Sequence, residues 1–376
     1  MAPASRIAAR LADLSHAQLL EIAAAGCEAS TEVKNRADAL LAAHKPLAQW
    51  AVEGVLLSSD LVPHLLAPLQ LEDGAAAAVC SRWAEGWKAT SEGRRRLTRV
   101  AFDFPRHLLG KDSFVMAEIP GDNEHLLVKS GALVRNLGRD MSSSGPSFEL
   151  PNFYGNVVAS EEFIYNTKDL SKEVYCRTHD GTEVARYEDP DKCIDCYTLA
   201  PGGLLFCELF DAHDNTQCEI IALDAQTLQP RHRFGLSLLN YVCAMVVVGE
   251  ELFVCDCGND RLQVFSLAGE HRRSITGEWK RPVSLCLVKD RLYLIEEYDT
   301  AQDDDGELIN PLQGRRIFVL SFHGDTLQVC THPAVPAHGP FVDPLAFWDI
   351  CYFDGKLLAS VRNELAFVGV LAFGWC

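Results

Sequence analysis

Apolar and polar residues alternate in short runs between Glu251 and Gly277, and turn residues separate the runs. Leu252–Cys255 is a short apolar run, and a second run with alternating polarity begins at Leu262. Between them lies Gly258-Asn259-Asp260, a sequence typical of a tight turn. The pattern predicts a β-meander. Such a small sheet cannot bury its apolar faces alone, so further copies are expected elsewhere in the chain.

Weaker copies of the same pattern occur on both sides of this stretch. The run that marks each copy begins at Leu126, Phe163, Leu204, Leu252, Leu292 and Leu357. Most of the spacings are close to the roughly 40 to 45 residues of one four-stranded propeller blade. The longest contains an acidic insert, 299–313, which we expect to be a surface loop. Residues 97–376 are too many for the alternative, a β-sandwich, and predict a mainly β fold: a six-bladed β-propeller.

The last unit, between Leu345 and Phe373, has only three clear strand patterns. Leu97–Phe104 precedes the first unit and also has the pattern of a strand. We therefore expect this segment to supply the fourth strand of the last blade. Pairing the two ends of the chain would close the ring and remove open sheet edges.

Residues 259–265 read Asn-Asp-Arg-Leu-Gln-Val-Phe. This segment resembles the N-x-R-I-Q-V-F strand of the NHL-repeat family, and the likeness is specific in this blade and loose in the others. The resemblance implies a six-bladed β-propeller, the same fold that the repeat spacing predicts.

The chain before the propeller is rich in Ala and Leu, and its apolar residues recur at helical spacing. Ser15 is suited to cap a first helix, Ser30 or Thr31 a second, and Pro46 to begin a third. Residues 1–56 are therefore predicted to form an α-helical N-terminal region.

Residues 57–96 contain a second helical pattern followed by Val-Cys-x-x-Trp. The segment resembles the F-box family, which shows L-P-x-E-L-L-x-x-I-F-x-x-L, an acidic turn and then V-C-x-x-W. Ser58 stands where that family has proline, and Gly74 where its second helix begins with leucine. The positions expected to form a partner-binding face are Leu57, Leu61, Leu65, Leu66, Leu69, Val79, Cys80 and Trp83.

An F-box binds the linker subunit of a cullin-based ubiquitin ligase, so the resemblance implies that partner. The spacing of four leucines by itself places them on one face of a helix: Leu61, Leu65, Leu66 and Leu69. This face has a second interpretation, in which it packs internally against the helices of residues 1–56.

The chain of 376 residues has a formal net charge of −18, and residues 97–376 contain almost all of the excess acid. Negative charge repels nucleic acids and attracts basic proteins. It also has a simpler interpretation, as a solvated surface that keeps the protein soluble. No apolar run reaches membrane-spanning length, and the first residues lack a secretory apolar core. The 14 cysteines are therefore expected to be reduced, in the cytoplasm or nucleus.

Candidate chemistry is sparse. Cys193 and Cys196 have the spacing of half a zinc site, and Cys255 and Cys257 are a possible second half. Because Cys255 belongs to a strand pattern and 189–191 is acidic, we expect no metal or redox site. Calcium-dependent lactonases and lyases resemble this propeller and use carboxylates and Asn around a central channel. The corresponding candidates here are Glu118, Asn152, Asn240 and Asp349.

The sequence thus favours an interaction adaptor without catalytic residues or cofactors. It would be a substrate-recognition subunit of a cullin-based ubiquitin ligase, with the propeller binding an unknown, possibly basic, protein. Two alternatives remain: a propeller scaffold with no role in ubiquitin transfer, and a calcium-dependent hydrolase or lyase.

Overall fold

The computed structural model describes most of the chain from residue 96 onward. The described ranges are 96–109, 113–120, 122–150, 155–167, 170–299, 310, 312–331, 346–362 and 366–375, together with Val62, Leu66, Trp83 and Glu85. The acidic insert 299–313 falls largely outside these ranges. Among the described residues, no helix is both long and apolar enough to cross a membrane.

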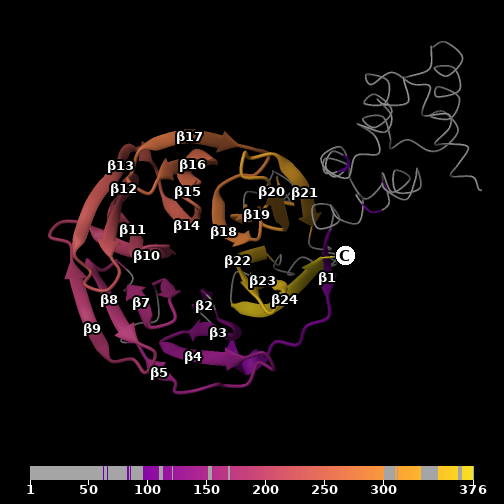
Figure 1. Cartoon of the computed structure of the whole chain (residues 1–376), viewed down its shortest axis with the longest axis horizontal. Helices are drawn as coiled ribbons and strands as arrows, with labels where there is room; N and C mark the ends of the chain where they lie inside the picture. Colours follow the sequence, from indigo (N-terminus) through magenta and orange to yellow (C-terminus); the bar gives the residue numbers. More distant parts are fainter. Residues whose placement is uncertain are drawn as a thin grey trace, which may run out of the picture. The chain divides into compact units, whose positions relative to one another are not determined.

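Within the described residues, 24 strands form six four-stranded sheets, arranged as the blades of a ring (Figure 1). In the first five blades the strands are neighbours in sequence order. Blade 1 consists of β2 (Phe114–Ile119), β3 (Asp122–Ser130), β4 (Leu133–Gly138) and β5 (Phe148–Glu149). Blade 2 consists of β6 (Val157–Ala159), β7 (Phe163–Thr167), β8 (Glu173–Thr178) and β9 (Glu183–Glu188). Blade 3 consists of β10 (Cys193–Ala200), β11 (Leu204–Asp211), β12 (Asp214–Asp224) and β13 (Pro230–Leu239).

The remaining blades follow the same plan. Blade 4 consists of β14 (Val242–Val248), β15 (Glu251–Asp256), β16 (Arg261–Ser266) and β17 (His271–Thr276). Blade 5 consists of β18 (Pro282–Val288), β19 (Arg291–Glu296), β20 (Arg316–Leu320) and β21 (Thr326–Thr331). Blade 6 consists of β22 (Ala346–Phe353), β23 (Lys356–Arg362), β24 (Phe367–Trp375) and β1 (Leu97–Val100). Two short 3₁₀ turns, η3 (Arg106–Leu108) and η4 (Cys257–Asn259), complete the elements of this region.

The six runs that marked the repeats lie on the second strands of the six blades, so the predicted six-bladed propeller is confirmed. The middle strands of a blade are buried on both faces by the adjacent blades, which explains their nearly continuous apolar runs. In blade 4, β15 and β16 are almost wholly buried, whereas the outer strand β17 is mostly exposed. The polar third run of the predicted meander is this outer strand.

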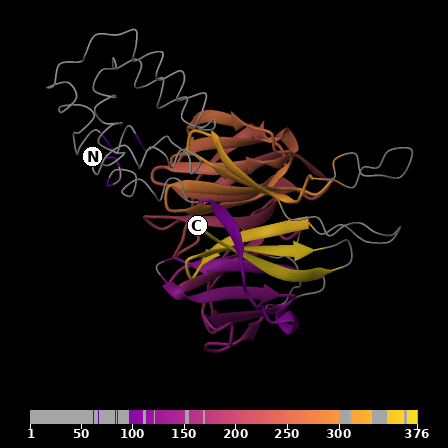
Figure 2. The same cartoon turned by 90° about the vertical axis from the view of Figure 1, so that its right-hand side faces the viewer.

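The chain closes the ring as expected, because β1 is hydrogen-bonded beside β24 in blade 6 (Figures 1 and 2). Its first residue also contacts blade 5, where Leu97 and Gln328 exchange hydrogen bonds of 2.8 and 3.0 Å. The strand is shorter than predicted and ends at Val100. The chain then leaves the sheet so that Phe104 packs edge-to-face on Phe114 in the core between blades 6 and 1.

Apolar side chains of adjacent blades interdigitate and hold the ring together. Between blades 4 and 5, Trp279 and Phe318 are fully buried and meet edge-to-face with ring centroids 5.8 Å apart. Gly277 is required beside them, because a Cβ at this position would lie 1.9 Å from the Trp279 ring. The core is therefore distributed around the ring and leaves the centre to the inner strands.

Contacts between Cα atoms divide the chain into two compact units, and one of them is Leu97–Gly374. The other contains Met1–Arg96 with the last two residues. In this second unit Val62, Leu66, Trp83 and Glu85 are helical. The predicted helices of residues 1–56, and most of the F-box-like module 57–96, lie outside the described residues.

Candidate functional site

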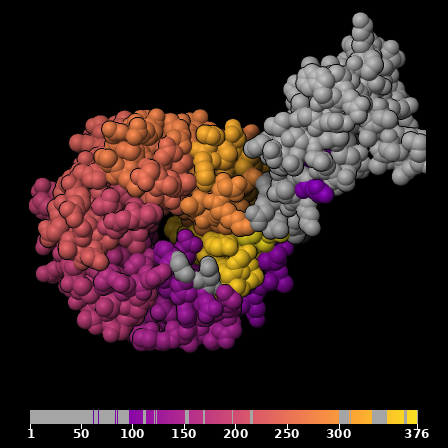
Figure 3. Space-filling view, in the orientation of Figure 1, coloured from indigo at the N-terminus to yellow at the C-terminus, as the bar shows by residue number. Residues whose placement is uncertain are grey.

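A cavity of about 660 Å³ occupies the centre of the ring and is lined mainly by the innermost strand of every blade. The space-filling view shows the hollow there (Figure 3). Since successive side chains of a strand point to opposite faces, each inner strand packs its side chains against the blades on either side and borders the cavity along its length. In β14, Met245 and Val247 pack in the core shared with blade 3, whereas Ala244 and Val246 pack against the core shared with blade 5.

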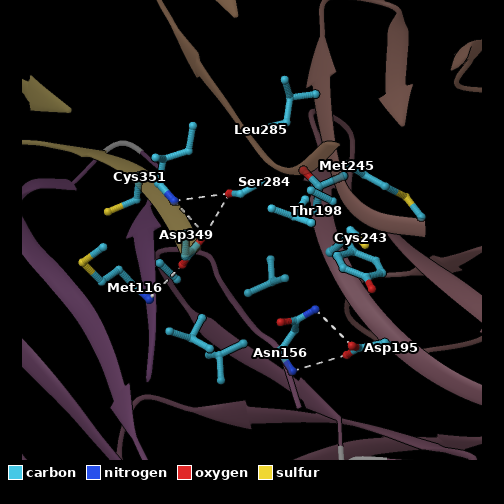
Figure 4. Close-up of a pocket in the computed structure, with 18 of the residues that line it drawn as sticks. Met116, Asn156, Asp195, Thr198, Cys243, Met245, Ser284, Leu285, Asp349 and Cys351 are labelled. Carbon is cyan, nitrogen blue, oxygen red and sulfur yellow. Dashed lines mark hydrogen bonds between the residues drawn. The ribbon is translucent and has the colours of Figure 1, made fainter. Parts of the chain in front are cut away.

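Asp349, in β22, lies on one side of the cavity (Figure 4). Its Oδ1 accepts hydrogen bonds of 2.9 Å from the Ser284 hydroxyl and from the Ile350 amide, and its Oδ2 accepts one of 3.4 Å from the Met116 amide. Burial raises the pKa of Asp349 to about 6, although these hydrogen bonds oppose the rise. One carboxyl group thus joins blades 5, 6 and 1.

Asp195, in β10, lies across the cavity from Asp349 (Figure 4). It accepts hydrogen bonds from the Asn156 amide nitrogen at 3.3 Å and from Asn156 Nδ2 at 3.0 Å, and a further one from the Thr167 hydroxyl. These donors all come from blade 2, so Asp195 joins blades 2 and 3. Because hydrogen-bond donors from neighbouring blades hold both carboxyl groups, the two aspartates have fixed positions at the cavity.

Two glutamates complete the acidic lining. Glu208 is buried beside β14, where its Oε1 accepts a 3.0 Å hydrogen bond from the Val242 amide. Burial raises its pKa to about 7. Glu118 reaches the solvent of the cavity, yet the surrounding protein still raises its pKa to about 7. Because a nearby cation favours the ionised form of a carboxyl group, such a cation would return both pKa values toward normal.

The balance of charge in the lining is negative. Five carboxyl groups face the cavity, from Glu118, Asp195, Glu208, Glu297 and Asp349, against the single guanidinium of Arg362 among the described lining residues. Lys129 lies behind this lining, with its Nζ 3.2 Å from the Ser113 hydroxyl. Burial lowers the pKa of Lys129 to about 8, while the Asp195 charge acts in the opposite direction. The cavity is therefore suited to a positively charged group.

Exposed apolar side chains border the same cavity. Trp348 is 44% exposed and Leu170 57% exposed, and both belong to the lining. The Arg362 guanidinium stacks over the Trp348 ring at 4.4 Å from its centroid. This cation–π contact holds the indole ring in place while leaving much of it open to a ligand.

The three cysteines of the lining are poor nucleophiles. Burial raises the pKa of Cys286 and of Cys351, and a hydrogen bond with Cys257, together with burial, raises that of Cys243. Only the thiolate form is strongly nucleophilic. These thiols stay protonated at neutral pH and act as small apolar groups.

Some of the residues that the sequence suggested for catalysis or metal binding line the cavity, and others do not. Glu118 and Asp349 do line the cavity, whereas Asn240 does not and Asn152 lies outside the described residues. The described residues contain no cluster of three or more His, Cys, Asp or Glu that could hold a metal ion. Cys193, Cys255 and Cys257 are buried free cysteines.

Of the F-box-like face, Leu66 and Trp83 are described, and both are buried helical residues. The other six positions of this face lie outside the described residues: Leu57, Leu61, Leu65, Leu69, Val79 and Cys80.

Sequence reasoning missed Asn156, Asp195 and Glu208. An alignment of the six repeats would have identified Asp195 as an acid on an otherwise apolar inner strand. Glu208 carries a comparable signal, an acid within the apolar run of a buried second strand, whereas Asn156 precedes its strand and carries none.

No protein-family model and no curated protein matches the chain. Solved structures do match. They include luciferin-regenerating enzyme, with a TM-score of 0.51 and 10% identity over 74% of this chain and 95% of that chain. Streptogramin B lyase has a TM-score of 0.49 and 12% identity over 75% and 98%. The WD40 β-propeller domain of Doa1 has a TM-score of 0.48 and 10% identity over 69% and 77%. At these identities the likeness shows the fold alone: this chain is similar to known β-propellers in architecture.

Proposed function

We propose that this protein is an interaction adaptor whose propeller binds a basic segment of a partner protein in the central cavity. The observation that carries the proposal is the combination, in one cavity, of five carboxyl groups with the exposed side chains of Trp348 and Leu170. Lys and Arg have apolar stems and cationic heads. Such a side chain can place its stem on the indole ring and its head among the carboxylates.

Selection from a randomised peptide display library tests this proposal. The full-length protein should enrich peptides with Lys or Arg, and Glu118→Gln or Asp349→Asn should weaken that enrichment. Glu270→Gln is the matched control, because Glu270 is 67% exposed in a turn remote from the cavity lining. Selection of neutral or acidic peptides, or equal enrichment by all variants, would contradict the proposal.

We further propose that residues 57–96 are an F-box-like module that docks to the linker subunit of a cullin-based ubiquitin ligase. The support is the sequence resemblance together with the helical conformation of Leu66 and Trp83. On this proposal, the propeller's partner is the substrate for ubiquitin transfer.

Co-purification with the recombinant linker subunit tests the docking proposal. Leu61→Asp should abolish capture and leave helical circular dichroism unchanged, because a buried unpaired charge costs several kcal/mol at an interface. Glu85→Gln, at an exposed helical position, is the control. Loss of helicity in Leu61→Asp, with no capture by the wild type, would support internal packing and leave a scaffold without a ubiquitin role.

A calcium-dependent hydrolase or lyase is the second candidate, and the position of Glu118 and Asp349 in the cavity favours it. It requires a bound cation, and the described residues provide no group of three metal ligands. Calorimetric titration with Ca²⁺ separates the two functions: micromolar binding lost in Asp349→Asn would favour the enzyme. We also propose that the adaptor functions in the cytoplasm or nucleus, compartments in which cysteine thiols stay reduced.

A further inference from the structure

A second cavity, of about 730 Å³, lies among turns of blades 1 and 2. Its lining includes Asp122, His125, Asn136, Ser144 and Gly145, and none of these residues lines the central cavity. It is thus separate from the proposed peptide site.

Three side chains of this cavity form a continuous chain of hydrogen bonds. Asp122 Oδ2 lies 2.7 Å from His125 Nδ1, and His125 Nε2 lies 3.0 Å from the Ser144 hydroxyl oxygen. An ionised carboxylate can only accept hydrogen bonds, so Nδ1 carries the imidazole proton. In the neutral ring, Nε2 is then an acceptor, and the Ser144 O–H donates to it.

Backbone contacts hold each member of this chain in place. Asp122 Oδ1 accepts hydrogen bonds from the amides of Glu124 at 2.8 Å and His125 at 3.1 Å, which orient its carboxylate. The Ser144 amide donates to the Asn136 carbonyl oxygen at 2.7 Å. An isolated bridge between Leu137 and Ser143 pins the same loop to β4. The three groups are therefore ordered before any ligand arrives.

We propose that Ser144 is a nucleophile, His125 its general base and Asp122 the positioning residue of a site that cleaves small polar carboxylic esters. The arrangement of a nucleophile bonded to a base that a third group orients is the one that activates serine. All three residues lie at a cavity open to solvent, with side-chain exposures of 38% for His125 and 28% for Asp122.

The reaction balances with water as the only co-reactant. Ser144 Oγ bonds to the ester carbonyl carbon as its proton passes to His125 Nε2. The ester C–O bond then breaks, and the departing alcohol takes that proton from His125. A water molecule attacks the acyl-serine, giving one proton to His125. Collapse of this second adduct releases the carboxylic acid and returns the proton from His125 to Ser144 Oγ.

Two neighbouring groups favour this chemistry over a purely structural network. Gly145 follows the nucleophile, and its amide makes no hydrogen bond to another described residue. A Cβ at Gly145 would meet nothing within 4 Å, so space is open beside it. The amide after the nucleophile is a common donor to the developing oxyanion. Asn136 Oδ1 is buried without a partner among the described residues, and a donor on the substrate would satisfy it.

Covalent labelling of the full-length protein with a fluorophosphonate probe tests the nucleophile. We expect one adduct, mapped to Ser144 by peptide mass spectrometry and absent from Ser144→Ala. Ser142→Ala is the matched control: Ser142 belongs to the same loop, but its hydroxyl donates to Asp140 at 2.6 Å. No adduct on Ser144 in the wild type, or equal labelling of Ser144→Ala, would overturn the proposal.

Hydrolysis of p-nitrophenyl acetate tests the roles of the other two residues. General-base catalysis is worth ~100-fold to 10,000-fold, so His125→Gln should reduce kcat by at least ~100-fold. Asp122→Asn keeps an acceptor for the turn amides but should also reduce kcat strongly, because it no longer fixes the imidazole tautomer. Circular dichroism melting confirms that each variant folds. Unchanged kcat in folded His125→Gln would overturn the assignment of the base.

Discussion

Arg316 donates two hydrogen bonds to the carboxylate of Glu296, from Nε to Oε1 at 2.7 Å and from Nη2 to Oε2 at 2.8 Å. Glu296 ends β19, its side chain is fully buried, and β20 begins at Arg316. Blade 4 repeats this pair, because Asp256 ends β15 and accepts a 2.7 Å hydrogen bond from Arg261 Nε. An arginine that begins the third strand, Arg261 of the NHL-like segment in blade 4 and Arg316 in blade 5, thus neutralises a buried acid that ends the second strand.

Removing the guanidinium should destabilise the propeller strongly. Arg316→Ala leaves the Glu296 carboxylate buried without its cation, which typically costs about 3–5 kcal/mol in the free energy of unfolding. Arg272→Ala is the control, since Arg272 and its partner Glu270 are 51% and 67% exposed. Exposed pairs are worth ~0–1 kcal/mol. Urea unfolding followed by tryptophan fluorescence measures both, and equal effects would contradict the assigned role of Arg316.

The closing strand should carry much of the propeller's stability. A chain beginning at Gly110 lacks β1, which leaves the edge of β24 and the side chain of Gln328 without their partners. A chain beginning at Arg94 keeps them. We expect the shorter chain to melt at a markedly lower temperature in differential scanning calorimetry. Identical melting would mean that ring closure contributes little.

The buried carboxyl of Glu208 should make stability depend on pH. Its pKa is about 7 in the folded protein, above the value of 4.5 of an unburied Glu. The folded state therefore binds more protons between these values, and the free energy of unfolding falls as pH rises from about 4.5 to 7. The loss is on the order of 3 kcal/mol.

Comparison of variants isolates this contribution. Glu208→Gln keeps an oxygen for the Val242 amide and removes the titrating group, so its unfolding free energy should decline less than that of the wild type over this pH range. Glu270→Gln, at an exposed site, should follow the wild-type curve. A wild-type curve parallel to that of Glu208→Gln would show that Glu208 does not titrate as inferred.

The cysteines should all be thiols. Ten are free in the described residues, and most of these are buried. Reaction of denatured, unreduced protein with a thiol reagent should count close to the 14 cysteines of the sequence. The native protein should react at few of them, since burial both shields the sulfur and raises the thiol pKa of residues such as Cys351. Several disulfides in freshly purified protein would contradict the expected compartment.

The sequence by itself determined the strands, the number of blades and the closing strand. Leu252 and its five counterparts mark buried second strands because a strand covered on both faces needs a local run of apolar residues, which is visible without a structure. Leu97 could be assigned to the last blade by counting, since a closed ring leaves no unpaired edge. The end of this strand could not be read from the sequence: β1 stops at Val100, and Phe104 beyond it packs in the core instead of extending the sheet.

Only the tertiary structure decided which polar residues meet. Asp195 and Asn156 belong to neighbouring blades, as do Asp349 and Ser284, and their contacts exist only because those blades pack side by side around one axis. His125 and Ser144 lie within one blade, 19 residues apart, and they meet because a loop folds back on β4. Period-two alternation records which face of a strand is buried, but no local pattern records which blades face each other across a cavity.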